Sequence, residues 1–373
     1  MIRFERFHER HIPAAAEFNE RLNTADVETD IRLDVNPDDT WIREEAQEAG
    51  LKRIQYVAVD DGAIRAAYKL KEQLFQINGR DVSTGMMQAP ISEGLINARY
   101  KLLGGLLLFD AQKRNRNLYV LGMGGFDSRY AQLVKRANWT LWEVPFLFRV
   151  VKPSGFLRHI QPLRSSGLRR SVMDIAATLH LGDVPARVWY RVKDRTRSLL
   201  EQMEWRTTPR FDETVDHIWE QARNHYSLIA RRDRTSLNHL MSPDDSRFHR
   251  LVATVRGEPI GWVVVMSNQL NGHKHFGNMK LGSLVDTLAV PGYEDHLVAL
   301  ATHYLTSFGA ELIVTNLSAD PWRRAAIGSG FHQAASNFIF GLSPALGGKS
   351  GAAADLIDTM HITRNDGDGP VNL

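Results

Sequence analysis

An internal duplication limits how this chain can fold more than any other feature of its sequence. Residues 84–151 contain an apolar run with a proline-marked loop, an amphipathic stretch, a second apolar run, a shorter amphipathic stretch and a final aromatic run. Residues 281–344 repeat these segments in the same order. The spacing of the apolar residues and the length of each segment predict strand, helix, strand, helix and strand in both blocks. Because a repeat of this size implies a repeated architecture, we expect two domains built on one plan.

The residues before each block extend the repeat. Residues 54–81 and 250–266 alternate apolar and polar side chains around Asp-Asp-Gly and Arg-Gly-Glu-Pro, which predicts hairpins. Helix-forming runs precede both hairpins, at residues 11–23 and 211–232. The expected fold class is therefore mixed α/β, in two tandem domains that each contain a twisted mixed sheet flanked by helices.

The expected boundaries follow from this plan. The N-terminal domain spans 1–152, a basic helical connector 153–201, the C-terminal domain 202–346 and a flexible tail 347–373. The connector is rich in arginine. Two interpretations stay open for it: a basic surface for nucleic acid, anionic lipid or a polyanionic glycan, or a partly helical linker with solvated arginines.

Composition excludes several classes of site and protein. The chain has no cysteine, which rules out disulfides, thiolate zinc sites and a cysteine nucleophile. No apolar run reaches the roughly 18–20 residues that cross a bilayer, and the first residues have no apolar signal core, so we expect a cytoplasmic protein without a transmembrane segment. A net charge of +3 is weak support for a nucleic-acid partner.

Histidine pairs are the only candidate metal ligands that stand out. They are His8 with His11 and His273 with His275. Two histidines alone do not make a convincing metal site. We therefore expect no metal.

The order of segments resembles the GNAT acyltransferases, in a tandem arrangement similar to the FemAB-like and mycothiol-synthase-like proteins. The resemblance rests on GMMQAPIS followed by YKLLGGLLL, and on LVKRANW and AIGSGF, which look like that superfamily's helix ending in Gly-Phe. It covers most of the chain. It implies a splayed fourth strand whose backbone faces the pantetheine arm of acetyl-CoA or another acyl-CoA.

The resemblance also implies a pyrophosphate-binding turn of the pattern Gln/Arg-x-x-Gly-x-Gly/Ala. Its nearest match begins at Lys101, keeps Gly104 and departs from the pattern at Leu106. Glycine and a helix start allow an anion to approach the backbone closely, but a structural Gly-Gly helix contact is an open alternative. The expected cofactor-binding residues are Ile91, Ser92, Lys101, Leu103, Gly104 and Gly105.

The corresponding turn of the second half has no glycine at its helix start. Glu294 and Asp295 stand there instead and would repel a pyrophosphate. We therefore expect the first half to bind acyl-CoA and the second half to be a degenerate partner.

Three residues are candidates for proton transfer. By register, the tyrosine implied by the resemblance falls at Val134 and Ala326, so Tyr130, one turn away, is the substitute or else a core residue. Asp286 interrupts an apolar strand. It is either a general base or a salt-bridged carboxylate. Glu93 lies beside the expected cofactor turn, where it positions the acceptor or caps a turn.

A final cluster, at residues 231–234, packs three arginines around an aspartate. Arg232, held by Asp233, would suit a phosphate or carboxylate on the acceptor, and a solvated helix end is the alternative.

Together these features predict an acyltransferase that moves an acyl group from coenzyme A to an amine or hydroxyl of a small molecule or cell-envelope precursor. A FemAB-like enzyme using aminoacyl-tRNA and a non-catalytic sensing or scaffold protein are the alternatives.

Overall fold

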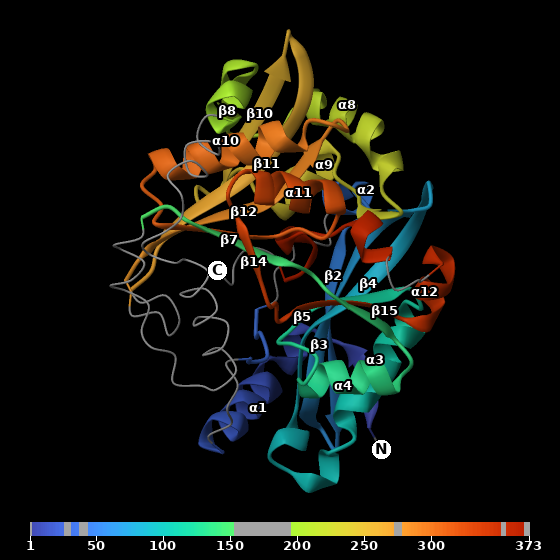
Figure 1. The fold of residues 1–373 in the computed structure, drawn as a ribbon. Helices are drawn as coiled ribbons and strands as arrows, with labels where there is room; N and C mark the ends of the chain where they lie inside the picture. Colours follow the sequence, from blue (N-terminus) through green and yellow to red (C-terminus); the bar gives the residue numbers. More distant parts are fainter. Residues whose placement is uncertain are drawn as a thin grey trace. The chain divides into compact units, whose positions relative to one another are not determined.

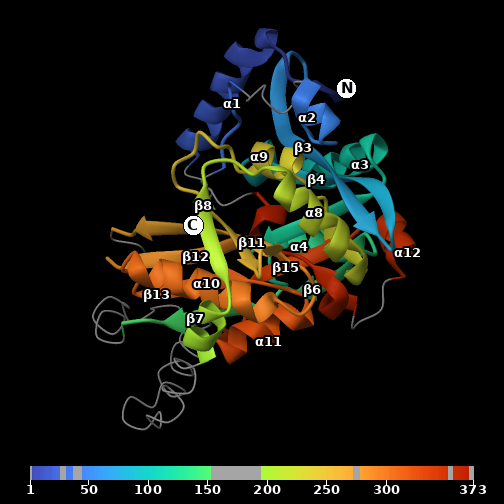
Figure 2. The same ribbon diagram turned by 90° about the horizontal axis from the view of Figure 1, so that it is seen from above.

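The computed structural model describes residues 2–25, 31–36, 44–152, 195–271, 278–351 and 356–368. The chain forms two compact units, each built on one mixed sheet with helices beside it (Figures 1 and 2). Unit 1 comprises residues 1–141 and 340–352, and unit 2 comprises residues 142–339 and 353–373. The mixed α/β class and the two sheets predicted from the sequence are confirmed.

Unit 1 contains a sheet whose strands follow the order β1-β2-β3-β4-β5-β15-β6. The strands are β1 (Arg3–Arg6), β2 (Lys52–Asp60), β3 (Ala63–Ile77), β4 (Arg80–Ser92), β5 (Leu118–Met123), β15 (Phe338–Leu342) and β6 (Thr140–Glu143). Two-residue turns with positive φ connect β2 to β3 at Asp61-Gly62 and β3 to β4 at Asn78-Gly79, as the twist of a tight hairpin requires.

The helices of unit 1 pack their apolar sides on this sheet. They are α1 (Ile12–Thr24), α2 (Glu44–Glu48), α3 (Leu103–Arg114), α4 (Arg129–Arg136) and α12 (Pro344–Ser350), with short 3-10 turns η1 (Glu9–His11), η3 (Glu93–Leu95) and η4 (Ala98–Tyr100). Helix α3 contacts β3 and β4, and α1 contacts β3.

Unit 2 contains a second sheet, in the order β14-β7-β13-β12-β11-β10-β8. The strands are β14 (His332–Ala334), β7 (Phe146–Val150), β13 (Leu312–Asn316), β12 (Lys280–Ala289), β11 (Glu258–Gln269), β10 (His249–Val255) and β8 (Glu204–Thr208). The short strands β9 (Leu228–Ala230) and β16 (Met360–His361) pair with each other in parallel.

In unit 2, helix α10 and helix α8 each pack on strands β11 and β12. The elements are α8 (Glu213–Ala222), α9 (Arg234–Leu240), α10 (Glu294–Ser307) and α11 (Asp320–Gly328), with the 3-10 turns η5 (Arg223–His225), η6 (Leu356–Thr359) and η7 (Arg364–Asp366). Asp212 begins α8 as its N-cap, accepting a hydrogen bond from the N–H of Thr214. None of the described helices is long and apolar enough to cross a membrane.

The two sheets have the same plan, but each receives its next-to-last strand from the other half of the sequence. Strand β7 follows β6 in the chain and yet lies between β13 and β14, while β15 follows β14 and lies between β5 and β6. Residues 142–152 therefore belong to unit 2 and residues 340–352 to unit 1, which differs from the expected boundaries at 152 and 346. The two strands are similar apolar runs, FLFRV and FIFGL, so either satisfies the same sheet position.

Candidate functional site

In unit 1 the parallel strands β4 and β5 are paired at one end and then separate. Residues 85–86 of β4 pair with residues 118–119 of β5, whereas β4 continues to Ser92. Ala89 has a φ of 46°, and the register against β3 shifts nearby, so the strand carries a bulge that increases its bend. Ile91 and Ser92 thus stand at the end of β4 beyond the paired region.

Helix α3 begins after the turns that follow β4. The N–H of Leu106 donates to the carbonyl of Leu102 at 3.2 Å, so the N–H groups of Leu103, Gly104 and Gly105 point out of the helix start. A Cβ placed on Gly104 or Gly105 would meet no described atom within 4 Å. The two glycines therefore have no neighbouring element against which a structural Gly-Gly contact could form. The start of α3 is open and carries a partial positive charge.

Glu93 lies between these two features and is almost wholly buried. Arg21 Nε donates to one carboxylate oxygen of Glu93 at 2.6 Å, and Arg65 Nη1 donates to the other at 2.9 Å. The Arg65 guanidinium also lies over the Tyr100 ring, 5.1 Å from its centroid. Glu93 is therefore the centre of an ion-pair cluster that holds two half-buried arginines beside the end of β4.

Unit 2 repeats the divergence, with different contents. Residues 281–283 of β12 pair in parallel with residues 312–314 of β13, and β12 then continues to Ala289 past a register shift opposite Val264 and Val265. Here the chain's own residues 360–362 bond to β12 and to a residue just after β13. His361 Nε2 donates to the carbonyl of Thr287 on β12 at 2.8 Å.

The bonds on the β13 side come from Ser318, just after that strand. Its Oγ accepts from the N–H of Ile362 at 2.8 Å and donates to the carbonyl of Met360. Its N–H donates to the carbonyl of Ile362 at 3.2 Å. The C-terminal segment thus links the separating strands β12 and β13 at the place that corresponds to the open end in unit 1.

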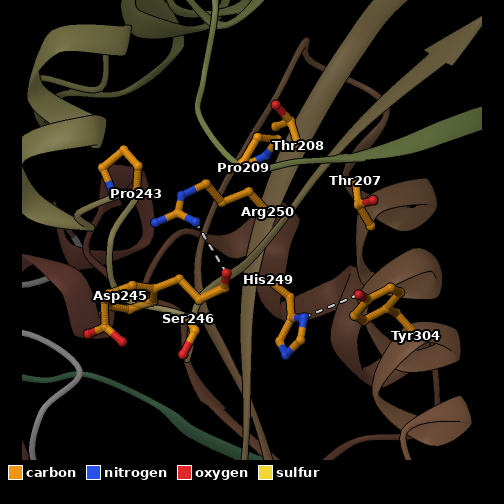
Figure 3. Close-up of a pocket in the computed structure, with 10 residues that line it drawn as sticks. Thr207, Thr208, Pro209, Pro243, Asp245, Ser246, His249, Arg250 and Tyr304 are labelled. Carbon is orange, nitrogen blue, oxygen red and sulfur yellow. Dashed lines mark hydrogen bonds between the residues drawn. The ribbon is translucent and has the colours of Figure 1, made fainter.

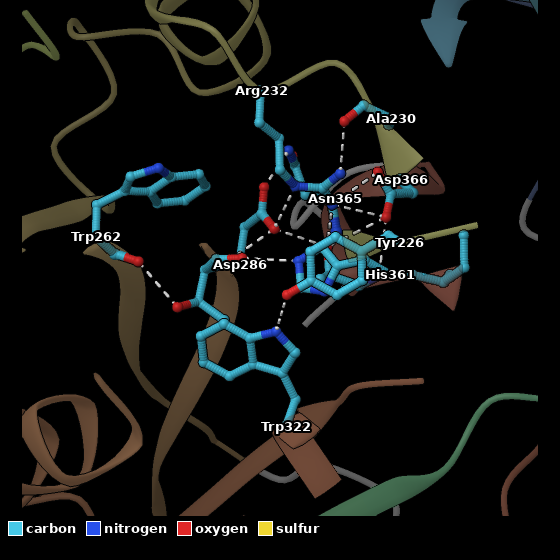
Figure 4. Close-up of polar contacts among 12 residues, drawn as sticks. Tyr226, Ala230, Arg232, Trp262, Asp286, Trp322, His361, Asn365 and Asp366 are labelled. Atoms are coloured by element: carbon cyan, nitrogen blue, oxygen red, sulfur yellow. Dashed lines mark hydrogen bonds and ion pairs between the residues drawn. The ribbon is translucent and has the colours of Figure 1, made fainter. Parts of the chain in front are cut away.

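Asp286 lies in the same region (Figure 4). Its exposed fraction is 0 %. It accepts hydrogen bonds from Arg232 Nε at 3.1 Å, Thr363 Oγ1 at 3.0 Å and Asn365 Nδ2 at 3.1 Å. Burial raises the pKa of its carboxyl, while the Arg232 guanidinium opposes that rise. This geometry favours the salt-bridged interpretation of Asp286 over that of a general base, because its buried oxygens accept these bonds and one more from the N–H of Thr287 at 3.0 Å.

Arg232 and Asp233 do not act together. Arg232 is 1 % exposed, and its Nη2 donates to both oxygens of Asp366, at 3.0 and 2.8 Å. Asp233 instead caps α9 by accepting from the N–H of Ser236 at 2.8 Å, and it pairs with Arg231. The fork that was expected to bind an acceptor is thus occupied by the protein's own carboxylates.

These contacts correct the expectation of a loose tail. Residues 356–368 are described and packed into unit 2, and Thr363, Asn365 and Asp366 are buried. The pattern Thr-x-x-Asp at 363–366 is a capping box, in which the Thr363 and Asp366 side chains bond each other's backbone. That local pattern was the one signal in the sequence that these residues form an ordered turn.

Comparison with known proteins finds similarity in structure alone. No protein-family model and no curated protein sequence matches the chain. A probable N-acyltransferase of unknown function from Enterococcus faecalis is similar with a TM-score of 0.51 and 6% identity, over 93% of this chain and 73% of that one.

Two enzymes with named activities are similar to the same extent. N-myristoyltransferase of Saccharomyces cerevisiae, with bound myristoyl-CoA, has a TM-score of 0.52 and 11% identity, over 92% of this chain and 78% of that one. A GCN5-related N-acetyltransferase of Anabaena variabilis has a TM-score of 0.52 and 7% identity, over 91% of this chain and 72% of that one. The chain has the GNAT fold. Its two sheets of identical strand order make the arrangement a tandem one.

The tyrosine that the resemblance implies would lie on the helix after the fifth strand of the GNAT fold. The two positions reached by register, Val134 and Ala326, are both fully buried. Tyr130 on α4 is half-buried and packs against the apolar cluster of unit 1. It lies in the same unit as Glu93 and Gly104, whereas Asp286 and Arg232 lie in unit 2.

The GNAT fold of unit 2 also carries a surface pocket of about 310 Å³ at the start of β10 (Figure 3). His249 and Tyr304 line it and are hydrogen-bonded to each other, with Tyr304 Oη 3.2 Å from His249 Nδ1, and burial lowers the pKa of His249. The neighbouring Arg250 donates to the carbonyls of Met241 and Ser242. None of the residues expected from the sequence lines this pocket.

Within the described residues, no group of three or more histidine, aspartate or glutamate side chains is arranged to hold a metal ion. His11 pairs with Glu5 at 3.0 Å. His273 and His275 lie outside the described residues, as does most of the expected basic connector.

Replacing Ser318 by Ala should destabilise unit 2 of this GNAT fold by about 1–3 kcal/mol. The change removes the hydroxyl that bonds Met360 and Ile362 and leaves two buried backbone groups without it. Urea unfolding followed by tryptophan fluorescence would measure the loss. Ser307→Ala is the control, because Ser307 is an exposed residue at the end of α10 whose hydroxyl bonds only the carbonyl of Tyr304 among the described contacts. Equal unfolding curves for the two variants would contradict the assigned role.

His361 should make stability depend on pH. Burial lowers the pKa of His361 well below its usual value, and the Arg232 charge lowers it further. Because the folded pKa lies below the unfolded value of about 6.5, stability should be complete above that pH and fall as the pH drops below it. The rings of Tyr226 and Trp322 flank the imidazole.

The test compares unfolding midpoints between about pH 7 and pH 5 for the wild type and His361→Gln. The carboxylates of the network, Asp286 and Asp366, are common to both proteins. The variant should therefore show a flatter pH dependence. A wild-type slope retained in the variant would assign the effect to the carboxylates.

Proposed function

We propose that this chain is an acyltransferase that takes an acyl group from acyl-coenzyme A bound to unit 1 and transfers it to an amine or hydroxyl of a small-molecule acceptor. One observation carries the proposal: the two units share a divergence of parallel strands, but their contents differ. In unit 2 residues 360–362 occupy it. In unit 1 it is followed by a helix start with two glycines that have free space around them.

The chemical fit is to a ligand with an extended polar arm and an anionic end. The last residues of β4 have backbone groups available for a pantetheine arm, and the N–H groups at the start of α3 favour a pyrophosphate. Lys101 is exposed beside them and adds positive charge. The similarity to the yeast structure with bound myristoyl-CoA supports this assignment.

The reaction forms a bond from the acceptor nitrogen or oxygen to the acyl carbon and breaks the thioester C–S bond. The acceptor loses a proton, and the departing thiolate gains one. We assign the thiolate proton to Tyr130 or to water. Glu93 is a positioning residue in this scheme, because both of its oxygens are held by Arg21 and Arg65, and Asp286 belongs to a structural network.

Calorimetric titration with coenzyme A, acetyl-CoA and myristoyl-CoA tests the proposal. We expect binding of one molecule per chain, because the corresponding place in unit 2 is filled by residues 360–362. Thiol release in the presence of amine and alcohol acceptors would then measure transfer. Absence of binding by all three ligands would reject the coenzyme A-dependent enzyme and leave the aminoacyl-tRNA-dependent and the non-catalytic alternatives.

A further inference from the structure

Helix α3 is apolar on two opposite faces. One face packs in unit 1 through Leu103, Leu107, Leu108 and Ala111. The other exposes a stripe at helical spacing, and the exposed fractions are 71% for Leu102, 39% for Leu106 and 55% for Phe109.

The turn η3, which contacts α3, adds one more exposed apolar side chain. Leu95 on that turn is 44% exposed. Isolated exposed apolar residues are common, whereas a row of them on one helix marks a binding surface. We call Leu95, Leu102, Leu106 and Phe109 the α3 stripe.

The segment of the chain that contains the α3 stripe carries a net positive charge. The segment 95–136 contains eight lysines and arginines, two aspartates and no glutamate, a net of +6 in a chain whose total is +3. One of the aspartates, Asp110, is neutralised by Arg114 at 2.7 Å. Lys113 Nζ lies 4.5 Å from the centroid of the Phe109 ring, and Lys101 is exposed beside Leu102.

We propose that the α3 stripe docks on the surface of an anionic lipid bilayer. The leucines and Phe109 enter the boundary between headgroups and acyl chains, and the flanking lysines and arginines meet the lipid phosphates. This combination is the chemistry of an interfacial helix and needs no membrane-spanning segment.

Charge argues against two other occupants. Two copies of this chain joined through the same face would bring two positive surfaces together, which is unfavourable. A nucleic acid would match the charge but leave Leu102 and Phe109 facing a polar backbone. An anionic bilayer satisfies both the apolar and the basic residues. The inference does not depend on the proposed enzymatic activity, since vesicle binding needs no coenzyme A.

The test is cosedimentation of the full chain with vesicles of equal parts phosphatidylcholine and phosphatidylglycerol, and with vesicles of phosphatidylcholine alone. We expect binding to the anionic vesicles, at least about tenfold weaker binding to the neutral ones, and weakening by salt. The double variant Leu106→Glu, Phe109→Glu should lose about tenfold or more in affinity. Its side chains are exposed in the wild type, so the melting temperature should not change.

The control is Ile327→Glu, because Ile327 is 52% exposed on α11 of unit 2. It should bind anionic vesicles as the wild type does. Equal binding of the double variant and the wild type would overturn the proposal, as would absence of binding to anionic vesicles. If the wild type forms a dimer that the double variant does not form, and neither binds vesicles, the α3 stripe is the interface with a second copy. If the protein binds RNA but not vesicles, the positive charge serves nucleic-acid binding.

Discussion

Gly104→Glu is expected to weaken binding of acyl-coenzyme A by more than about a hundredfold without destabilising the protein. The new side chain would stand where the proposed pyrophosphate approaches, and its negative charge would repel it. The fold itself should tolerate the change, since a Cβ at this position meets no described atom within 4 Å. Glutamate in the first turn of a helix is also favourable, and glycine is the poorer helix former by about 1 kcal/mol.

Affinity and stability should thus change in opposite directions, which calorimetry and thermal unfolding measure separately. Gly348→Glu is a matched control, because Gly348 is a helical glycine of α12 with equally free space around it. Lys101→Ala should weaken binding about fivefold or less, as an exposed charge does. Unchanged affinity in Gly104→Glu would remove the start of α3 as the acyl-donor site even if the enzyme were active.

Arg232→Met is expected to destabilise unit 2 by about 3–5 kcal/mol. The change keeps much of the apolar volume but leaves Asp286 and Asp366 buried together without their shared cation. It also removes the bond from Arg232 Nη1 to the carbonyl of Ala230, at 2.9 Å. The C-terminal turn and strand β9 should therefore lose their common anchor. Urea unfolding and protection of the amides of residues 360–366 from hydrogen exchange would report the loss.

Two further variants separate this structural role from catalysis. Arg197→Ala removes an exposed ion pair with Glu201 and should change stability by less than about 1 kcal/mol. Asp286→Asn should lower stability and leave turnover per folded molecule nearly unchanged. A hundredfold loss of turnover in Asp286→Asn at unchanged stability would instead restore Asp286 as the general base. If Arg232→Met does not accumulate as folded protein, Arg232→Lys provides the measurement, since lysine keeps the charge but not the fork.

Much of the fold could be predicted from local pattern. The turns at Asp61-Gly62 and Arg256-Gly257 have positive φ at both residues, as the hairpin signals predicted. The Gly-Gly pair at the start of α3 could also be recognised in the sequence, because two adjacent glycines are unusual in a helix and are seen without knowledge of distant residues. The local sequence pattern could not decide whether Arg232 binds an acceptor. The guanidinium can do so only if no carboxylate of the protein holds it, and Asp366, which does hold it, lies 134 positions away in the sequence.

The sequence by itself determined the duplicated order of elements, the mixed α/β class and the difference between the helix starts at Gly104 and at Glu294, since these depend on periodicity, turn residues and charge near one another in the chain. Only the tertiary structure decided which sheet receives β7 and β15, because two apolar aromatic strands of similar length satisfy either position. It also decided that residues 360–362 fill the divergence of β12 and β13 and that Thr363 and Asn365 bond Asp286. A short polar segment gains its stability from partners distant in sequence, and no local pattern encodes who those partners are.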